Sequence, residues 1–414
     1  MKVVGLITEY NPFHNGHEYH IKEAKRITGA DYVVVVMSGN FVQRGTPAFM
    51  DKYTRTRMAL ECGADIVFEL PVCFATSSAE YFAHGAVALL DRLGIVDFIC
   101  FGSESGDIKA LTSLAKILID EPEEYKVYLN AAVKSGKTFP EARMEAISKI
   151  IDISFGTLLS APNNTLGIEY IKAIINLDSN ITPVTITRKI AGYHSEDLTK
   201  AEGTAISSAT AIRKNLNDID SLNNLKNHVP IGVFSLLTEE YNKTFPITEE
   251  DCSLLLNYRL LMLDKMSLSE FLDINSDLAN RISKFIGKNH SYNTLAQQLK
   301  SRQWTLTRIN RALIHILLGI RKADMLEYKM DGYAQYARVL GFKKESSHLL
   351  RQITKNEKIP VITKLGSSAD KLNPLGKRML EKDILAATLY NQIVFYKYQR
   401  ELPDEYTRGV IISN

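Results

Sequence analysis

The sequence predicts an α/β fold, a doubly wound parallel sheet followed by a mainly α-helical C-terminal domain. Short apolar segments alternate with helical segments up to about residue 190, and strand patterns fade after about residue 215. Strands that alternate with helices form βαβ units, and right-handed crossovers then place helices on both faces of a parallel sheet. Leucine-rich helical segments dominate the rest of the chain.

Five apolar runs account for the expected strands. The run 32–37 is continuously apolar and mostly β-branched, which is typical of a strand buried on both faces. The other expected strands are 3–8, 65–70, 97–101 and 181–187. Helices are expected at 17–28, 51–62, 78–93 and 165–175, with a helical insertion over about 108–153. In the C-terminal part, 253–263 and 306–320 are the clearest helical segments.

The length and the charge distribution both divide the chain. A chain of 414 residues exceeds one comfortable core, so we expect two domains, 1–220 and 221–414. Residues 281–400 contain 23 basic and 8 acidic side chains, a charge of +15, whereas the remainder carries −12. Clustered lysine and arginine favour a polyphosphate partner, with solvated helix faces as the alternative. This basic segment is expected to lie in the helical domain, away from the sheet.

Cysteine spacing and hydropathy exclude several classes of protein. Cys62, Cys73, Cys100 and Cys252 are far apart and form no C-x-x-C pair, so disulfides or a zinc site are not expected. They are interpreted as small buried apolar residues. No apolar run approaches the roughly 18 residues that span a bilayer, and residues 1–7 are too short for a signal segment. We therefore expect a cytoplasmic protein with no membrane partner.

The first motif follows the first expected strand. A loop containing Pro12 leads into His14-Asn15-Gly16-His17, where a helix begins. Ligands of parallel sheets bind outside the carboxyl ends of the strands, and a helix start offers free N–H groups to a phosphate. Gly16 lets the backbone approach a phosphate closely. Two imidazoles can stabilise charge on a leaving pyrophosphate. We therefore favour a role in adenylyl transfer from ATP over the alternative that these are ordinary loop histidines.

A second motif lies about 190 residues further on, near the last expected strand. Ile206-Ser207-Ser208-Ala209-Thr210-Ala211-Ile212-Arg213 places two hydroxyl side chains at a helix start and a cation one turn later. Ser208 and Thr210 can donate to phosphate oxygens, and Arg213 can bind the β- and γ-phosphates. The stretch Lys265-Met266-Ser267-Leu268-Ser269 is set aside as a chance match to a nucleotide-binding loop.

These two motifs resemble H-x-G-H and I-S-S-T-x-I-R of the nucleotidylyltransferase superfamily, with Ala209 replacing the second serine. Further segments resemble the bacterial tRNA(Met) cytidine acetate ligase family over essentially the whole chain; these are 9–17, 37–45, 69–71, 101–104 and 162–170. The resemblance implies that ATP and acetate form acetyl-adenylate, and that the acetyl group passes to N4 of the wobble cytidine of elongator tRNA(Met).

The resemblance also implies the site residues. The catalytic residues are His14, His17 and Arg213, and the ATP-binding residues are Ile7, Thr8, Glu9, Tyr10, Asn11, Pro12, Phe13, His14, Asn15, Gly16, His17, Glu18, Tyr19, His20, Gly102, Asn163, Arg188, Ser208 and Thr210. Residues 1–220 would form the ATP-binding catalytic domain and 221–414 the tRNA-binding domain. Mg²⁺ is expected with ATP, a protein metal site is not, and no DNA partner is expected.

Several of these residues allow a second interpretation. Gly102 could be a simple turn glycine, Asn163 a helix N-cap and Arg188 a surface arginine. Arg44, in a loop after the second strand, could reach acetate or phosphate. The group Lys52, Arg55 and Arg57 could touch RNA or form a solvated face.

Two other functions remain open at this point. A small-molecule adenylyltransferase of the NAD or CoA type shares the motifs but needs no basic helical domain. A non-catalytic RNA-binding protein with a degenerate nucleotide fold would not need intact histidines at both H-x-G-H positions.

Overall fold

A computed structural model of the chain describes residues 1–137, 139–150, 158–188, 198, 205–216, 218–288 and 290–414. Its main sheet contains the strands β1 (Val3–Thr8), β2 (Tyr32–Ser38), β5 (Ile66–Leu70), β6 (Phe98–Ser103), β7 (Thr182–Thr187), β8 (Ala337–Lys343), β9 (Val361–Ile362) and β10 (Ile411–Ser413). The order is β10-β8-β5-β2-β1-β6-β7, with β9 beside β8. Because β5, β2, β1, β6 and β7 pair in parallel, the predicted doubly wound sheet is confirmed.

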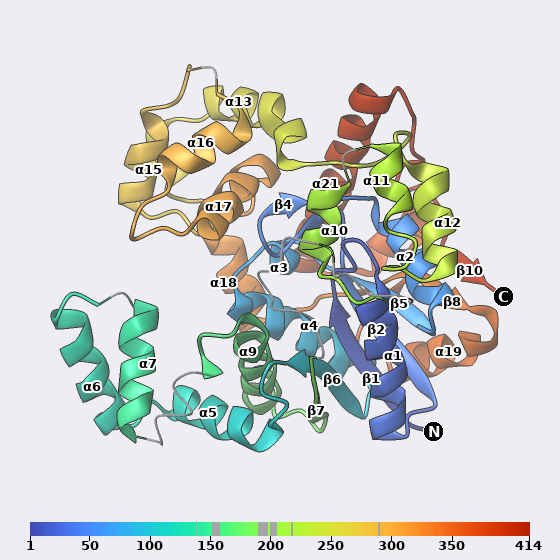
Figure 1. Ribbon diagram of the computed structural model, residues 1–414, viewed down its shortest axis with the longest axis horizontal. Coiled ribbons are helices and arrows are strands. Elements are labelled where there is room, and N and C mark those ends of the chain that lie inside the picture. Colours follow the sequence, from blue (N-terminus) through green and yellow to red (C-terminus); the bar gives the residue numbers. More distant parts are fainter. Residues whose placement is uncertain (138, 151–157, 189–197, 199–204, 217, 289) are drawn as a thin grey trace.

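The side chains of β2 show why helices cover both faces. Val33, Val35 and Met37 point into one core, and Val34 and Val36 into the other, because successive side chains of a strand alternate. The first core is covered by α1 (Asn15–Thr28) and α2 (Lys52–Glu61), and the second by α4 (Ala79–Leu93) and α9 (Pro162–Asn176). Figure 1 shows this layered arrangement.

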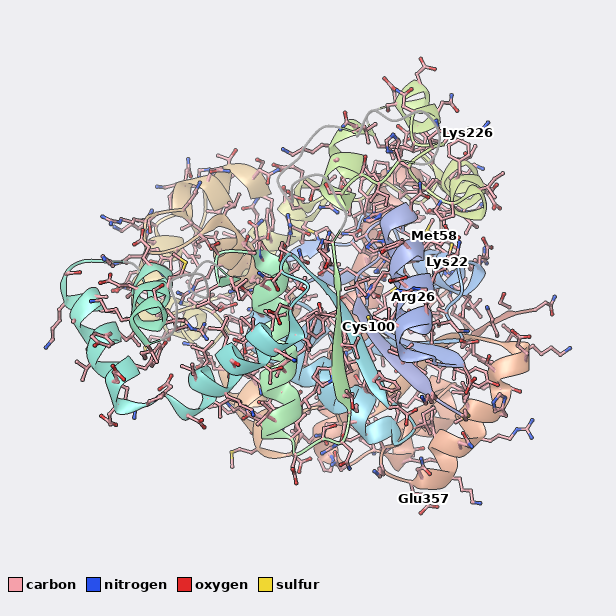
Figure 2. All side chains as sticks on the ribbon, turned by 60° about the horizontal axis from the view of Figure 1, so that its bottom comes forward. Lys22, Arg26, Met58, Cys100, Lys226 and Glu357 are labelled. Carbon is pink, nitrogen blue, oxygen red and sulfur yellow. The ribbon has the colours of Figure 1, made fainter. Side chains whose placement is uncertain are left out.

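Helix α1 is amphipathic, and its two sides meet different surroundings. Ile21 and Ala24 are buried against the sheet, whereas the side chains of Lys22 and Arg26 are 69% and 70% exposed. Figure 2 shows these two cations on the outward side of the helix and Cys100 within the sheet. The helix ends at Gly29, whose left-handed backbone (φ 61°) suits a residue without a Cβ atom. The start of α1 follows the end of β1 after the short loop 9–14.

A helical insertion follows β6, as predicted. It comprises α5 (Ile108–Asp120), α6 (Glu123–Lys134) and α7 (Phe139–Ile150). Helices α6 and α7 pack on each other and project away from the sheet (Figure 1). The last residues of the expected insertion, 151–153, lie outside the described residues.

The remaining helices form two groups on opposite sides of the sheet. The short helices α10 (Ala209–Asn215), α11 (Ile219–Asn223) and α12 (Ile231–Glu240) extend the core that α1 and α2 cover. A second group gathers apart from the sheet in Figure 1; it contains α13 (Ser253–Leu261), α14 (Lys265–Leu268), α15 (Ser276–Ser283), α16 (Tyr292–Leu299) and α17 (Leu306–Leu318). The last helices are α18 (Lys322–Met330), α19 (Ser347–Asn356), α20 (Leu365–Ser368) and the long α21 (Pro374–Tyr398). Helix α21 packs against α3 (Val72–Ala75), a short helix that follows β5.

The C-terminal part also returns to the sheet, which the sequence did not predict. Strand β8 pairs antiparallel with β5, and β10 pairs parallel with β8. The expectation that the basic segment 281–400 lies away from the sheet is therefore wrong, because β8 belongs to that segment. Strand β8 contains Arg338 and Gly341, so its composition gives a weak strand pattern. The division of the chain after residue 220 stays a prediction.

Candidate active site

A cavity of about 260 Å³ opens at the carboxyl ends of β1, β6 and β7, where the starts of α1, α9 and α10 converge. This is the position at which open parallel sheets bind ligands. The predicted site residues that line it are Ile7, Thr8, Glu9, Tyr10, Asn11, His14, Gly16, His17, Tyr19, His20, Gly102, Asn163, Arg188, Ser208, Thr210 and Arg213. The geometry thus brings both motifs and the later residues to one place.

Four other predicted residues lie outside the cavity lining. Pro12 follows a cis peptide bond, and Phe13 is fully buried with its ring 5.4 Å from that of His17. Glu18 forms an ion pair with Lys22 on the outer side of α1. The Asn15 side-chain amide donates to the carbonyls of residues 205 and 227, both at 2.8 Å. Asn15 and Phe13 therefore support the site from outside its space, whereas Glu18 is directed away from it.

The imidazoles of His14 and His17 are fixed by backbone groups. Nδ1 of His14 accepts the Gly16 N–H at 3.1 Å, and Nδ1 of His17 accepts the His14 N–H at 3.3 Å. The rings stack with centroids 3.7 Å apart. Since each Nδ1 is an acceptor, a neutral ring must carry its proton on Nε2. Both histidines therefore present Nε2–H as a hydrogen-bond donor.

Burial keeps these imidazoles uncharged in the ligand-free protein. Burial, followed by the charges of Arg188 and Arg213, lowers the pKa of His14 to about 3. Burial, and next the neighbouring His14, holds the pKa of His17 well below its usual range. The pKa of His20 falls to about 4, again mainly through burial. Near neutral pH the site offers neutral donors, together with the permanent charge of arginine.

Gly16 is required for a reason that the sequence did not show. A Cβ atom at this position would lie 2.9 Å from Cε1 of His14 and 3.3 Å from Cγ2 of Ile206. The His14 ring folds over the glycine, so an added methyl group would displace the imidazole. Close approach of a phosphate to this backbone is a separate expectation.

The second motif lies against the first. Oγ of Ser208 caps α10 by accepting the Ala211 N–H at 3.0 Å. The Arg213 guanidinium donates to the Asn11 carbonyl and, at 3.3 Å, to Oγ1 of Thr210. Arg213 thus fastens the helix of the second motif to the loop of the first. Two segments about 190 residues apart form one wall of the cavity.

Gly102, Asn163 and Arg188 form one cluster. Arg188 donates to Oδ1 of Asn163 at 3.1 Å, and Nδ2 of Asn163 donates to Oε1 of Glu104 at 2.6 Å. A Cβ atom at Gly102 would lie 3.1 Å from Cγ of Arg188, so the glycine leaves room for the arginine. The interpretation of Asn163 as an N-cap is wrong, because the N-cap of α9 is Ala161.

Comparison with known proteins now identifies the family. The family model described as HIGH Nucleotidyl Transferase matches residues 1–405. A protein of Acetivibrio thermocellus named tRNA(Met) cytidine acetate ligase is 42% identical over 420 residues, covering 100% of both chains. A Thermoanaerobacter pseudethanolicus protein of the same name is 43% identical and covers 94% of this chain and 95% of its own.

The chain belongs to the tRNA(Met) cytidine acetate ligase family. The crystal structure of Thermotoga maritima TmcAL bound with alpha-thio ATP is similar to the whole chain, with a TM-score of 0.90 and 32% identity; the match covers 100% of this chain and 99% of that one. The predicted resemblance and the predicted fold class are confirmed.

In this member of the tRNA(Met) cytidine acetate ligase family, several cavity residues were not predicted as site residues, although most of them lie in segments that carry the family resemblance. Gln43 comes from the loop after β2, where only Arg44 had been considered, and both line the cavity. The other unpredicted lining residues are Phe82, Phe101, Leu166, Tyr170, Ile186, Thr187, Ile206 and Ala209. Most are apolar, and an apolar residue at a strand end or helix start looks like an ordinary core residue in sequence.

Two basic residues of α2 are not where the sequence suggested. Lys52 and Arg55 are fully buried, so they neither touch RNA nor form a solvated face. Nζ of Lys52 lies 2.7 Å from Glu69 and 2.8 Å from Glu405. The Arg55 guanidinium donates to backbone carbonyls, including that of residue 9 at the cavity. Of the three, Arg57 is exposed.

The structure also bears on the cysteines, on metal binding and on membrane-spanning helices. All four cysteines are buried free thiols, as predicted. Among the described residues, no group of three or more His, Cys, Asp or Glu side chains could hold a metal ion. No helix in the described part of this chain has the length and apolar character needed to cross a membrane.

Proposed function

We propose that the protein is an ATP-dependent ligase that forms acetyl-adenylate from acetate and acetylates N4 of the wobble cytidine of elongator tRNA(Met). The observation that carries this proposal is the convergence of His14, His17 and Arg213 on one cavity in a chain that matches the family over its full length. The same cavity residues are proposed as the ATP site, and His14, His17 and Arg213 as the catalytic residues.

In the proposed first half-reaction, an acetate oxygen forms a bond to the α-phosphorus of ATP while the bond to pyrophosphate breaks. The electron pair leaves with pyrophosphate. The Nε2–H groups of His14 and His17 donate to the oxygens on which this charge develops, and Arg213 balances the charge. These donors are held by backbone contacts before ATP arrives, so little reorganisation is needed during the reaction.

In the proposed second half-reaction, N4 of cytidine attacks the acetyl carbonyl. The carbonyl–oxygen bond to AMP breaks, AMP leaves with the electron pair, and one proton leaves N4. No cysteine or serine nucleophile takes part. A wobble base lies in a single-stranded loop, so it can be turned out of the RNA stack into the cavity.

Magnesium is proposed to enter as the counter-ion of the ATP substrate. Among the described lining residues, Glu9 is the one carboxylate, and the Nδ1 atoms of His14 and His17 already accept backbone N–H groups. This donor set does not fit a protein-held Mg²⁺, which prefers oxygen ligands.

The helices around α15–α17 are proposed to bind tRNA. No acidic residue occurs from Leu278 to Ala323, a stretch that includes nine lysine or arginine residues. The side chains of Lys284, Lys288, Lys300 and Arg302 in this stretch are exposed. An uninterrupted set of exposed cations suits the phosphates of an RNA backbone. With tRNA and ATP as its substrates, the protein is proposed to work in the cytoplasm.

The reaction is tested with labelled acetate, ATP, Mg²⁺ and total bacterial tRNA. After digestion of the RNA to nucleosides, label is expected in N4-acetylcytidine, and omission of ATP should abolish it. A matched reaction replaces tRNA with mononucleotides. Label that appears in no nucleoside would contradict this proposal. ATP consumption that depends on added mononucleotides and forms a dinucleotide would support the small-molecule adenylyltransferase instead.

A further inference from the structure

The cavity has arginines on two sides of its first strand. Among the described lining residues the arginines are Arg44, Arg188 and Arg213. Arg188 follows β7 and belongs to the cluster with Gly102 and Asn163, and Arg213 lies in α10. Arg44 comes from the hairpin of β3 (Phe41–Val42) and β4 (Thr46–Pro47), which follows β2. Since β2 and β6 flank β1 on opposite sides, the hairpin approaches the cavity from the side opposite β6 and β7.

Adenylate formation needs a cation on that side. Acetate and the α-phosphate are both anions, so their approach is opposed unless a positive group lies near the carboxylate. In phosphoryl transfer the attacking and leaving oxygens lie roughly in line, on opposite sides of phosphorus. If pyrophosphate leaves toward His14, His17 and Arg213, the carboxylate must approach from the other side of the α-phosphate.

We infer that Arg44 binds the carboxylate of acetate and holds it in line with the α-phosphorus. This inference rests on the proposed function and assigns to Arg44 the binding of its carboxylate substrate. A guanidinium has two parallel N–H groups whose spacing matches the two oxygens of a carboxylate. One oxygen attacks phosphorus, the bond to pyrophosphate breaks, and no proton is transferred, so a permanent cation serves better than an acid or base.

The hairpin is held rigidly enough to position this side chain. The Gln43 N–H donates to Oε1 of Glu9 at 2.8 Å, and the Gly45 N–H donates to the Val42 carbonyl at 2.9 Å, closing a tight turn. Arg44 lies between these two fixed points. The hairpin therefore needs no ordering when acetate binds, which reduces the entropic cost of binding.

The hairpin also packs against the basic helices. The Tyr292 hydroxyl of α16 lies 3.3 Å from the Gly45 carbonyl oxygen and 3.1 Å from that of Asn310 in α17. Gly45 has a φ of +73°, and a Cβ atom there would lie 2.2 Å from the backbone nitrogen of Arg311. Gly45 and Tyr292 are thus positioning residues for Arg44, and the proposed tRNA-binding helices support the acetate side of the cavity.

The test is acetate-dependent ATP–pyrophosphate exchange, which reports adenylate formation without tRNA. For Arg44→Gln we expect the KM for acetate to rise about 10- to 100-fold, because a charge-assisted pair is lost. The KM for ATP should stay within about twofold. Arg44→Lys should recover part of the loss, and Arg57→Gln, an exposed arginine on the neighbouring helix, should behave as the unmodified protein.

Gly45→Ala provides an independent test that leaves Arg44 in place. The added methyl group must push the hairpin away from α17, so the KM for acetate should rise while ATP binding, measured by calorimetry, is retained. An unchanged acetate KM in Arg44→Gln would overturn the inference. An equal rise in both KM values would assign Arg44 to the phosphates and overturn it as well. No acetate-dependent exchange in the unmodified protein would instead overturn the proposed function, and this inference with it.

Discussion

The two sides of the cavity are built in different ways. On the proposed phosphate side, contacts between residues two or three apart fix the imidazoles: His14 with Gly16, and His17 with His14. On the hairpin side, Gly45 meets Tyr292, 247 positions away. The imidazole pair of the first side is a local motif whose own backbone fixes both rings, whereas the support of the hairpin exists only after the C-terminal helices have packed.

This difference teaches where each kind of substitution should act. A change on the phosphate side should alter the chemical step at saturating acetate. A change on the hairpin side should alter acetate binding and respond to the packing of distant helices.

The largest effect is expected from His17→Ala. Loss of a preorganised donor to the leaving pyrophosphate should lower the rate of adenylate formation by about 10²- to 10³-fold, measured as pyrophosphate release at saturating acetate. Binding of tRNA, measured by filter retention, should be unchanged, and His348→Ala, outside the cavity, should keep full activity. If excess acetate restored the activity of His17→Ala, His17 would act in acetate binding and not in the departure of pyrophosphate.

The next effect distinguishes two glycines. In Gly16→Ala the methyl group would meet Cε1 of His14 at 2.9 Å, so the imidazole must shift. We expect kcat to fall about 10- to 100-fold, as misplaced catalytic groups typically cause, with the acetate KM little changed. Gly45→Ala should show the reverse pattern. Steady-state kinetics of the two variants measure both constants. If both substitutions changed kcat alone, or both changed the acetate KM alone, the two sides of the cavity would not have separate roles.

A smaller effect is expected from the basic helices. Replacing Lys284, Lys288, Lys300 and Arg302 with glutamine should weaken tRNA binding about tenfold at moderate salt. The slope of log affinity against log salt should become shallower by about 3, because each lost phosphate contact removes somewhat less than one unit. Acetate-dependent pyrophosphate exchange without tRNA serves as the control and should be retained. Unchanged tRNA affinity would exclude this surface as the binding site.

The smallest effect concerns pH and stability. The pKa of His14 is about 3 in the folded protein but about 6.5 in an unfolded chain, so below pH 6.5 the unfolded state binds a proton that the folded state does not. The free energy of unfolding should therefore fall between pH 7 and pH 5, by roughly 1–2 kcal/mol for this group. His14→Asn should flatten that pH dependence in chemical denaturation. Equal pH slopes for both proteins would show that His14 is not buried as described.

The sequence predicted the first side of the cavity well. Strand β1, the helix after it and the second motif were all predicted from local patterns, and the structure brings their residues together. Gly16 was predicted as a site residue, but its contact with the His14 ring was not, because a ring orientation depends on three-dimensional packing. Asn163 was likewise predicted to lie at the site, whereas its pairing with Glu104 and Arg188 joins three separate segments.

The interpretation of α2 shows the opposite case. Lysine and arginine are mostly exposed in proteins, so Lys52 and Arg55 gave a surface pattern. Only the fold brings Glu69 and Glu405 to Lys52, and their charges offset its desolvation. Strand β8 was missed for a related reason: its neighbour β5 lies about 270 residues earlier in the chain, and local composition does not record such a pairing.

The sequence alone determined the parallel sheet, the two motifs that meet at the cavity and the family resemblance, because periodicity and short motifs encode contacts between residues close in the chain. Tertiary structure decided which side chains share the cavity, that Asn15 and Phe13 support the site from outside it, and that the hairpin with Arg44 rests on the basic helices. Those contacts join segments up to hundreds of residues apart. They form only where the whole chain packs, so no local pattern predicts them.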